Sequence, residues 1–133
     1  MKKIILGVAG GLVTWIVVAT IGNRLLRAGV AGYTDGEATM TFTRSMLFGR
    51  LVLGAVSTLI AGYVAAWLSG SSNVGAKVLA GVLLVLFVPM HIALWAKFPA
   101  WYHLVFLASL VVFTLVGAKL RNSQTSNATL PTP

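Results

Sequence analysis

Four apolar blocks dominate this chain of 133 residues, and each is long enough to cross a lipid bilayer. They cover residues 4–21, 47–68, 78–95 and 101–118. At a rise of about 1.5 Å per residue, each block forms a helix of roughly 27–33 Å, close to the roughly 30 Å thickness of the hydrocarbon layer. The sequence therefore predicts an integral membrane protein.

The composition narrows the class further. Hydrophobic residues make up 58% of the chain and charged residues 9%, which excludes a soluble globular domain. Cysteine is absent, so thiol redox chemistry, iron–sulfur clusters and cysteine zinc sites are excluded. The net charge is +8, but most basic residues flank the apolar blocks, as anchors to anionic headgroups do. We expect membrane lipids as partners, and neither a cofactor nor nucleic acid.

The fold class that follows is all-α, a transmembrane four-helix bundle in up-down-up-down order with one longer interfacial connection. The bundle is expected to occupy residues 1–121, with spans at about 4–22, 46–68, 75–95 and 100–118. The turn at residues 96–99 is so short that the third and fourth spans must form an antiparallel hairpin. Residues 122–133 are polar and contain proline, which predicts a disordered tail.

The longer connection, residues 28–45, carries two conflicting signals. Residues 34–37 have the spacing of a capping box at a helix start. Residues 39–43 instead alternate polar and apolar side chains, as a strand at the interface does. We expect a short amphipathic segment lying at the interface, and its secondary structure stays open.

An even number of spans places both termini on one side of the membrane. The numbers of Lys and Arg on the two sides are equal, five against five, so the positive-inside rule does not decide the orientation. Lys2 and Lys3 before the first span favour cytoplasmic termini, with that span as an uncleaved anchor. The equal numbers also allow a dual orientation.

Small residues recur at helical spacing in the first two spans. Gly7 and Gly11 lie four residues apart in the first span, and Gly54, Thr58 and Gly62 continue this spacing in the second. Small residues let helix backbones approach closely inside a membrane, where dispersion contacts drive helix association. These positions are the predicted helix-packing residues, within the bundle or between copies of it.

Most side chains capable of chemistry gather around the last turn. Both histidines lie about one helical turn inside the membrane, on either side of that turn, so they can face each other. Pro89 is expected to kink the third span beside them. One hypothesis is a pocket for a lipid headgroup or small ligand, and another is an ordinary aromatic belt at the interface. A metal site is not expected, because no third ligand is near in sequence. The predicted pocket residues are His91, Trp95, Lys97, Trp101, Tyr102 and His103.

Arg50 is the second candidate, roughly one turn inside the second span. Three interpretations stay open. Its side chain extends to the interface, or it pairs with Asp35 or Glu37 and folds the connection onto the bundle, or it joins Arg24 in a site for an anion or lipid phosphate.

The segment from His91 to His103, with Trp95, Lys97–Pro99 and Trp101–Tyr102 at fixed spacing, resembles small, uncharacterised four-span bacterial membrane proteins. The resemblance implies a bacterial inner membrane and brings no activity with it.

No Asp or Glu lies inside any predicted span, which argues against a proton-coupled drug antiporter. The first functional hypothesis is a non-enzymatic membrane protein, either an oligomerising scaffold or an accessory subunit of a larger complex. The alternative is a small oligomeric channel or transporter for an anion or lipid that uses Arg50, His91 and His103. A membrane enzyme built on the two histidines ranks third.

Overall fold

The computed structural model describes residues 1–70 and 73–129 of the chain, and this part is helical without strands. Its helices are α1 (Lys2–Gly29), α2 (Tyr33–Thr39), α3 (Arg44–Leu68), α4 (Asn73–Ala93) and α5 (Ala100–Ala128). All but α2 are long and apolar enough to cross a membrane. The predicted all-α bundle with four candidate spans is confirmed.

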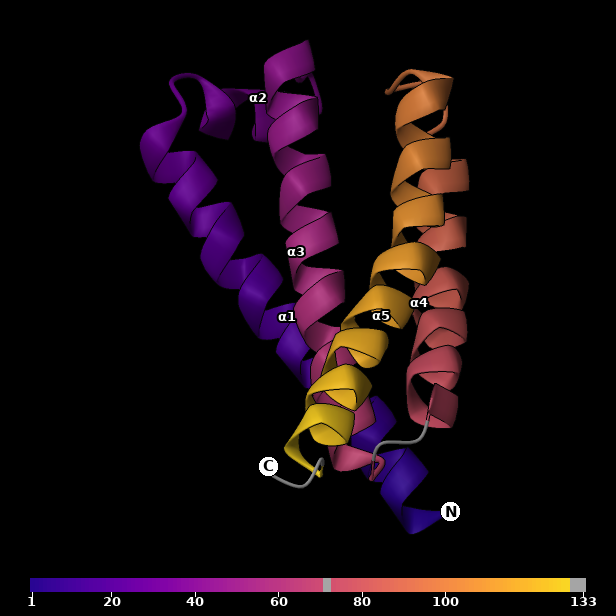
Figure 1. Ribbon diagram of the computed structural model, residues 1–133. Helices are drawn as coiled ribbons and strands as arrows, with labels where there is room; N and C mark the ends of the chain where they lie inside the picture. Colours follow the sequence, from indigo (N-terminus) through magenta and orange to yellow (C-terminus); the bar gives the residue numbers. More distant parts are fainter. Residues whose placement is uncertain (71–72, 130–133) are drawn as a thin grey trace.

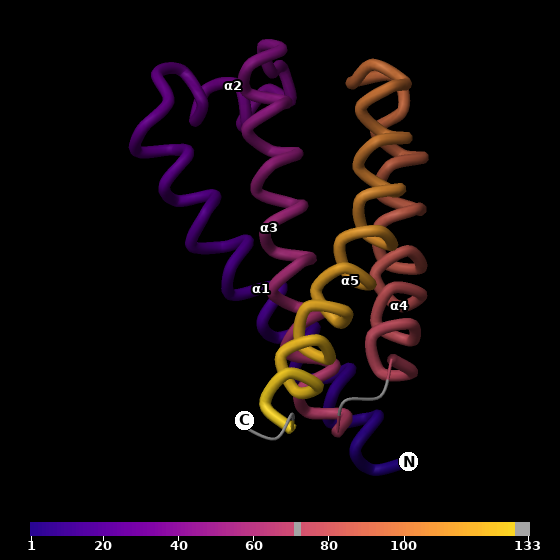
Figure 2. Tube along the Cα trace, viewed as in Figure 1, coloured from indigo at the N-terminus to yellow at the C-terminus, as the bar shows by residue number. Residues whose placement is uncertain are grey.

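Helix α3 is the centre of the bundle, since it packs against α1, α4 and α5 (Figure 1). The start of α1 and the end of α5 lie at one end of the molecule. Helix α2, the start of α3 and the α4–α5 connection lie at the other end (Figure 1). Helix α1 crosses α3 obliquely and diverges from α5 toward this second end, as the backbone trace shows (Figure 2). We refer to this second end as the α2 end.

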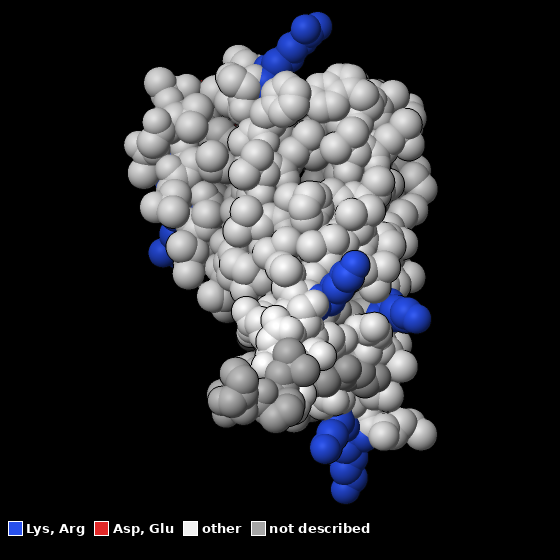
Figure 3. Space-filling model, in the orientation of Figure 1, with Lys and Arg blue, Asp and Glu red and all other residues white. Residues whose placement is uncertain are grey.

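The surface of the bundle is apolar on its long helices. Side chains such as Ile5, Val52, Val85 and Val112 are more than half exposed. The face in Figure 3 carries Lys and Arg only as isolated projections on a broad uncharged surface. Exposed apolar area of this extent fits a helix bundle surrounded by lipid. The chain is a multi-pass membrane protein.

Among the described residues, helix α3 makes its most extensive contact with α5, and this contact depends on two glycines. A Cβ atom added to Gly62 would lie 2.1 Å from the carbonyl oxygen of Thr114. A Cβ atom added to Gly117 would lie 2.1 Å from the carbonyl oxygen of Leu59. Backbone thus meets backbone in both places, and only glycine fits there.

The other predicted packing residues also contact helices of the same chain. Gly7 and Gly11 of α1 lie against backbone carbonyls of α3, and Gly54 of α3 lies against the ring of Phe106. The Thr58 hydroxyl donates to the Gly54 carbonyl at 2.7 Å and accepts from the Trp15 indole at 3.0 Å. These contacts are intramolecular, so the small residues give no separate argument for an oligomer.

The long connection forms a short helix rather than a strand. Gly32, with φ of 73°, precedes α2 and serves as its N-cap without a side-chain hydrogen bond. Thr34 therefore lies inside the helix, and the capping-box spacing is not used. Met40 ends α2 in the left-handed region at φ of 54°. Thr43 caps α3 instead, because its hydroxyl accepts from the Met46 amide at 3.3 Å.

Helix α5 continues through Ala128. The sequence had predicted that a disordered tail begins earlier, at residue 122. Two contacts hold this extension on the bundle. Tyr63 of α3 donates to Gln124 at 2.7 Å, and Asn122 donates to Asn73 at the start of α4 at 2.7 Å. These hydrogen bonds between polar side chains thus stabilise the part of α5 that continues beyond its apolar span. Residues 130–133 of the predicted tail lie outside the described residues.

Candidate functional site

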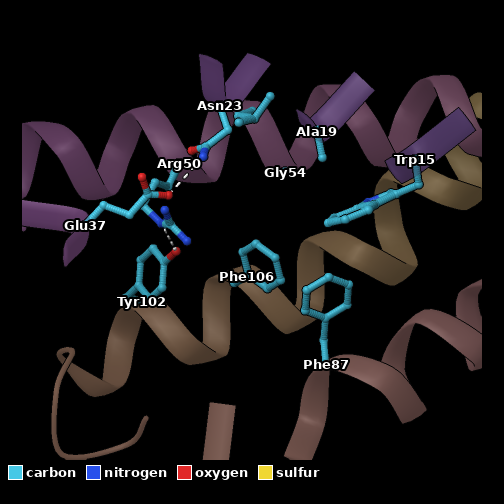
Figure 4. A pocket seen from close by; sticks show the side chains of 10 residues that line it. Trp15, Ala19, Asn23, Glu37, Arg50, Gly54, Phe87, Tyr102 and Phe106 are labelled. Atoms are coloured by element: carbon cyan, nitrogen blue, oxygen red, sulfur yellow. Dashed lines mark hydrogen bonds between the residues drawn. The ribbon is translucent and has the colours of Figure 1, made fainter. Parts of the chain in front are cut away.

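A cavity of about 160 Å³ lies in the half of the bundle toward the α2 end, between α1 and α5 and against α3. Its polar and aromatic residues lie at opposite ends (Figure 4). The polar end has Arg50, Glu37, Asn23 and the Tyr102 hydroxyl, and the other end has aromatic rings. The lining residues are Trp15, Ala19, Asn23, Glu37, Arg50, Leu53, Gly54, Phe87, Tyr102 and Phe106.

Arg50 is half-buried and is held by aromatic side chains. Its Nη1 donates to the Tyr33 hydroxyl at 2.9 Å and its Nε donates to the Tyr102 hydroxyl at 3.4 Å. The guanidinium carbon lies 4.8 Å from the centre of the Phe42 ring, a cation–π contact. The Arg50 side chain thus ties α3 to the connection and to α5, whereas a side chain extended to the interface would lie free of such contacts.

Glu37 pairs with Arg27 of α1 rather than with Arg50. The Arg27 Nε donates to Glu37 at 2.6 Å, and the Asn23 amide donates to the other carboxylate oxygen at 2.9 Å. Asn23 in turn accepts from the Tyr33 hydroxyl at 2.9 Å. The hydrogen bond from Arg27 holds the pKa of Glu37 below its ordinary value, against a smaller opposing effect of burial. The ion pair folds the connection onto the bundle, as one interpretation of the sequence proposed, but through a different arginine.

The lowered pKa predicts how the docking of α2 depends on pH. Because the pKa of folded Glu37 is below its unfolded value, its contribution is complete above that unfolded value, about 4.3, and is lost as the pH falls through the folded pKa. We expect Glu37→Gln to lower the melting temperature slightly at about pH 7, because Gln cannot form the ion pair with the solvent-accessible Arg27. The difference from the unsubstituted protein should shrink at about pH 3.

Asp35→Asn is the matched control, because Asp35 is exposed and lies on the same short helix. Thermal unfolding in detergent followed by circular dichroism measures both variants. Equal melting temperatures for Glu37→Gln and Asp35→Asn at neutral pH would contradict this account of the ion pair.

A second, more open groove of about 360 Å³ adjoins the cavity along α1. It shares Trp15, Ala19 and Asn23 with the cavity and extends to Arg24 and Arg27. Arg24 therefore lies on the same side as Arg50, as the sequence suggested, but on the rim rather than in the cavity. Asp35 lies exposed on α2 and does not line either space.

The two histidines face each other, as their sequence spacing suggested. The Nδ1 atoms of His91 and His103 lie 2.7 Å apart, so one ring donates a hydrogen bond to the other. Both side chains are buried, His91 with 8% and His103 with 0% of its surface exposed. Trp95 stacks on His103 at a centroid distance of 4.8 Å, and Phe106 stacks on His91 at 4.7 Å. Among the described residues no group of three His, Asp or Glu side chains gathers around a common point.

The predicted cluster around the last turn divides into three parts. His91, His103 and Trp95 form the stacked pair, and Tyr102 reaches the cavity. Trp101 turns toward Phe48 of α3, with ring centres 5.6 Å apart, and remains partly exposed. Lys97 is exposed on the connection.

Several cavity residues were absent from the sequence-based candidates. Trp15, Asn23, Phe87 and Phe106 come from helices whose apolar residues extend around the whole circumference, so periodicity does not mark a functional face. Of these four residues, Asn23 alone has a signal in the sequence, because it is a polar residue at the end of the first predicted span.

A scan against models of protein families gives no match to this chain. Neither curated proteins nor solved structures match it.

Proposed function

We propose that this protein binds an anionic lipid or lipid-like amphiphile that enters the cavity from the bilayer. The charged group would contact Arg50, and the hydrocarbon chain would lie along Trp15, Phe87 and Phe106. The observation that carries this proposal is the division of one cavity into a guanidinium end and an aromatic end. An amphiphile has the same division.

The depth of the two ends supports the proposal. Arg50 lies six residues after the start of α3, about 9 Å along the helix. Trp15 lies eight residues before Asn23 on α1, about 12 Å deeper than the polar end. The polar end therefore lies near headgroup depth and the aromatic end within the hydrocarbon layer.

The charge balance selects an anion. Arg27 and Asn23 already occupy both oxygens of Glu37, so this carboxylate is matched. Arg50 is bonded to two neutral phenols, which use two of its five N–H donors. A guanidinium with donors left over binds phosphate and carboxylate groups well.

This proposal develops the lipid-binding alternative of the sequence and replaces the scaffold hypothesis. The scaffold rested on small residues, which pack within the chain.

Quenching of Trp15 fluorescence by brominated lipids tests the proposal. The three other tryptophans, Trp67, Trp95 and Trp101, are replaced by Phe, and the variant is placed in nanodiscs. We expect brominated phosphatidylglycerol to quench Trp15 at a lower mole fraction than brominated phosphatidylcholine, because only the anionic headgroup has a partner in Arg50.

A second variant that keeps only Trp67 is the control. Trp67 is 57% exposed near the end of α3 farthest from Arg50, so it samples the surrounding lipid. Both brominated lipids should quench Trp67 equally. The proposal fails if Trp15 also shows no preference between the two lipids.

The location that accompanies this proposal is a bacterial inner membrane with both termini in the cytoplasm. Because the chain has no cysteine, single cysteines at exposed Lys97 and Ser126 can be labelled with an impermeant maleimide in intact cells. Labelling of Lys97→Cys alone supports this orientation, and labelling of Ser126→Cys alone reverses it.

A further inference from the structure

The cavity is small for the amphiphile that it is proposed to hold. It encloses about 160 Å³, whereas sites for small molecules commonly have about 300–1,000 Å³. The adjoining groove along α1 has about 360 Å³. A ligand that uses both spaces therefore finds the volume that the cavity alone lacks.

One row of α1 side chains borders both spaces. Trp15, Ala19 and Asn23 follow one another at intervals of four residues, so they lie on one face of the helix. Most residues that line only the groove come one position later along the helix, which places them on the neighbouring face: Ile16, Thr20, Arg24 and Arg27. The cavity and the groove therefore lie side by side and both extend along α1 from the level of Trp15 to that of Asn23.

The row leaves a passage between the two spaces at its middle. Ala19 has a single side-chain carbon, and the larger Trp15 and Asn23 lie one turn away on either side of it (Figure 4). The neighbouring Thr20 is also small and is exposed. All lining residues of the groove belong to α1, so its opposite side is open to the surrounding lipid.

Polarity changes with depth in the same direction in both spaces. In the cavity Arg50 lies at the polar end, near Asn23. In the groove Arg24 and Arg27 lie at the Asn23 end, and Ile16 lies about 10 Å deeper along α1. The linings of the two spaces thus carry three arginines and one carboxylate near headgroup depth. This arrangement fits one anionic headgroup with two hydrocarbon chains below it.

We propose that the ligand is a two-chain anionic lipid that straddles this row of α1, with one hydrocarbon chain in the cavity and the other in the groove. This inference rests on the proposed function and names its ligand class, a diacyl phospholipid rather than a fatty acid or a single-chain lysolipid. The headgroup lies at the Asn23 end of the row, between Arg50 and Arg24. Because the groove is open to lipid, the ligand enters from the bilayer along α1.

Calorimetric titration in detergent with two probes tests this assignment. Dihexanoyl phosphatidylglycerol has two chains, and hexanoyl lysophosphatidylglycerol has one chain with the same headgroup. Thr20→Trp fills the groove from an exposed position that does not line the cavity. We expect it to lower the affinity for the two-chain probe about tenfold and to keep that for the single-chain probe within about twofold, because it removes the space for one chain only.

Val17→Trp is the matched control, because Val17 is exposed on the same helix and lines neither space. It should leave both affinities within about twofold of those of the unsubstituted protein. Ile16→Trp fills the deeper part of the groove and should repeat the effect of Thr20→Trp. This second variant decides the matter even if Thr20→Trp fails to fold.

If the groove variants change the affinities for the two probes equally, or change neither, the two-chain assignment is overturned and the proposed function stays intact. Light scattering tests a different occupant of the groove. A dimer that dissociates in Thr20→Trp would place a second copy of the chain there and overturn the assignment. An unsubstituted protein that binds neither probe overturns both proposals.

Discussion

Replacing Arg50 with Leu is expected to lower the affinity for dihexanoyl phosphatidylglycerol by about tenfold to a hundredfold. A charge-assisted hydrogen bond contributes about 1.5–3 kcal/mol, and each 1.4 kcal/mol changes the affinity tenfold. Arg50 is the arginine of the cavity lining, and the carboxylate of that lining, Glu37, forms its ion pair with Arg27 outside it. Calorimetric titration at constant pH and salt measures the change.

Arg50→Lys separates charge from geometry. Lysine keeps the positive charge but lacks the planar fork that contacts Tyr33 and Tyr102 at the same time. We expect an affinity between those of the unsubstituted protein and Arg50→Leu.

Arg44→Leu is the matched control, because Arg44 is exposed at the start of the same helix and does not line the cavity. This variant removes the same charge at the α2 end and should keep the affinity within about twofold, since an exposed charge is screened. A similar loss in Arg44→Leu and Arg50→Leu would mean that general surface charge, rather than the cavity, attracts the lipid.

The spans and their order follow from hydropathy alone, and the reason is physical. Backbone groups in lipid must form hydrogen bonds with one another, so an apolar segment of bilayer length forms a helix. The short turn before Pro99 then leaves only an antiparallel hairpin for α4 and α5. Gly62, one of the predicted packing positions, lies where the backbone of α3 meets the backbone of α5 at Thr114, and Gly54 lies against the ring of Phe106.

The partners of each helix were not predictable to the same degree. A helix that is apolar on every side carries no stripe that identifies its buried face. The sequence therefore placed Arg50 about one turn inside the second predicted span but did not identify its contacts with Tyr33 and Tyr102. It also named Arg50 as one partner for Glu37, whereas helix α2 brings this carboxylate to Arg27.

Replacing Gly62 with Ala is expected to destabilise the bundle by about 3 kcal/mol. The added Cβ would lie 2.1 Å from the carbonyl oxygen of Thr114 and 2.8 Å from its Cα atom. These are backbone atoms, so no rotation of a side chain relieves the overlap, and α3 must move away from α5. The higher helix propensity of Ala, worth about 1 kcal/mol, offsets only part of this loss. Unfolding in mixed micelles with increasing dodecyl sulfate, followed by circular dichroism, measures the free energy.

Gly81→Ala is the matched control, because a Cβ atom at Gly81 would have no neighbour within 4 Å. It should leave the free energy of unfolding unchanged or raise it by up to about 1 kcal/mol. Gly117→Ala opens the same contact between α3 and α5 from the other side, at the Leu59 carbonyl. Once one substitution has separated the helices, the second meets less resistance, so the double variant should lose less than the sum of the single losses. Equal stabilities of Gly62→Ala and Gly81→Ala would show that α3 and α5 do not pack this closely in the membrane.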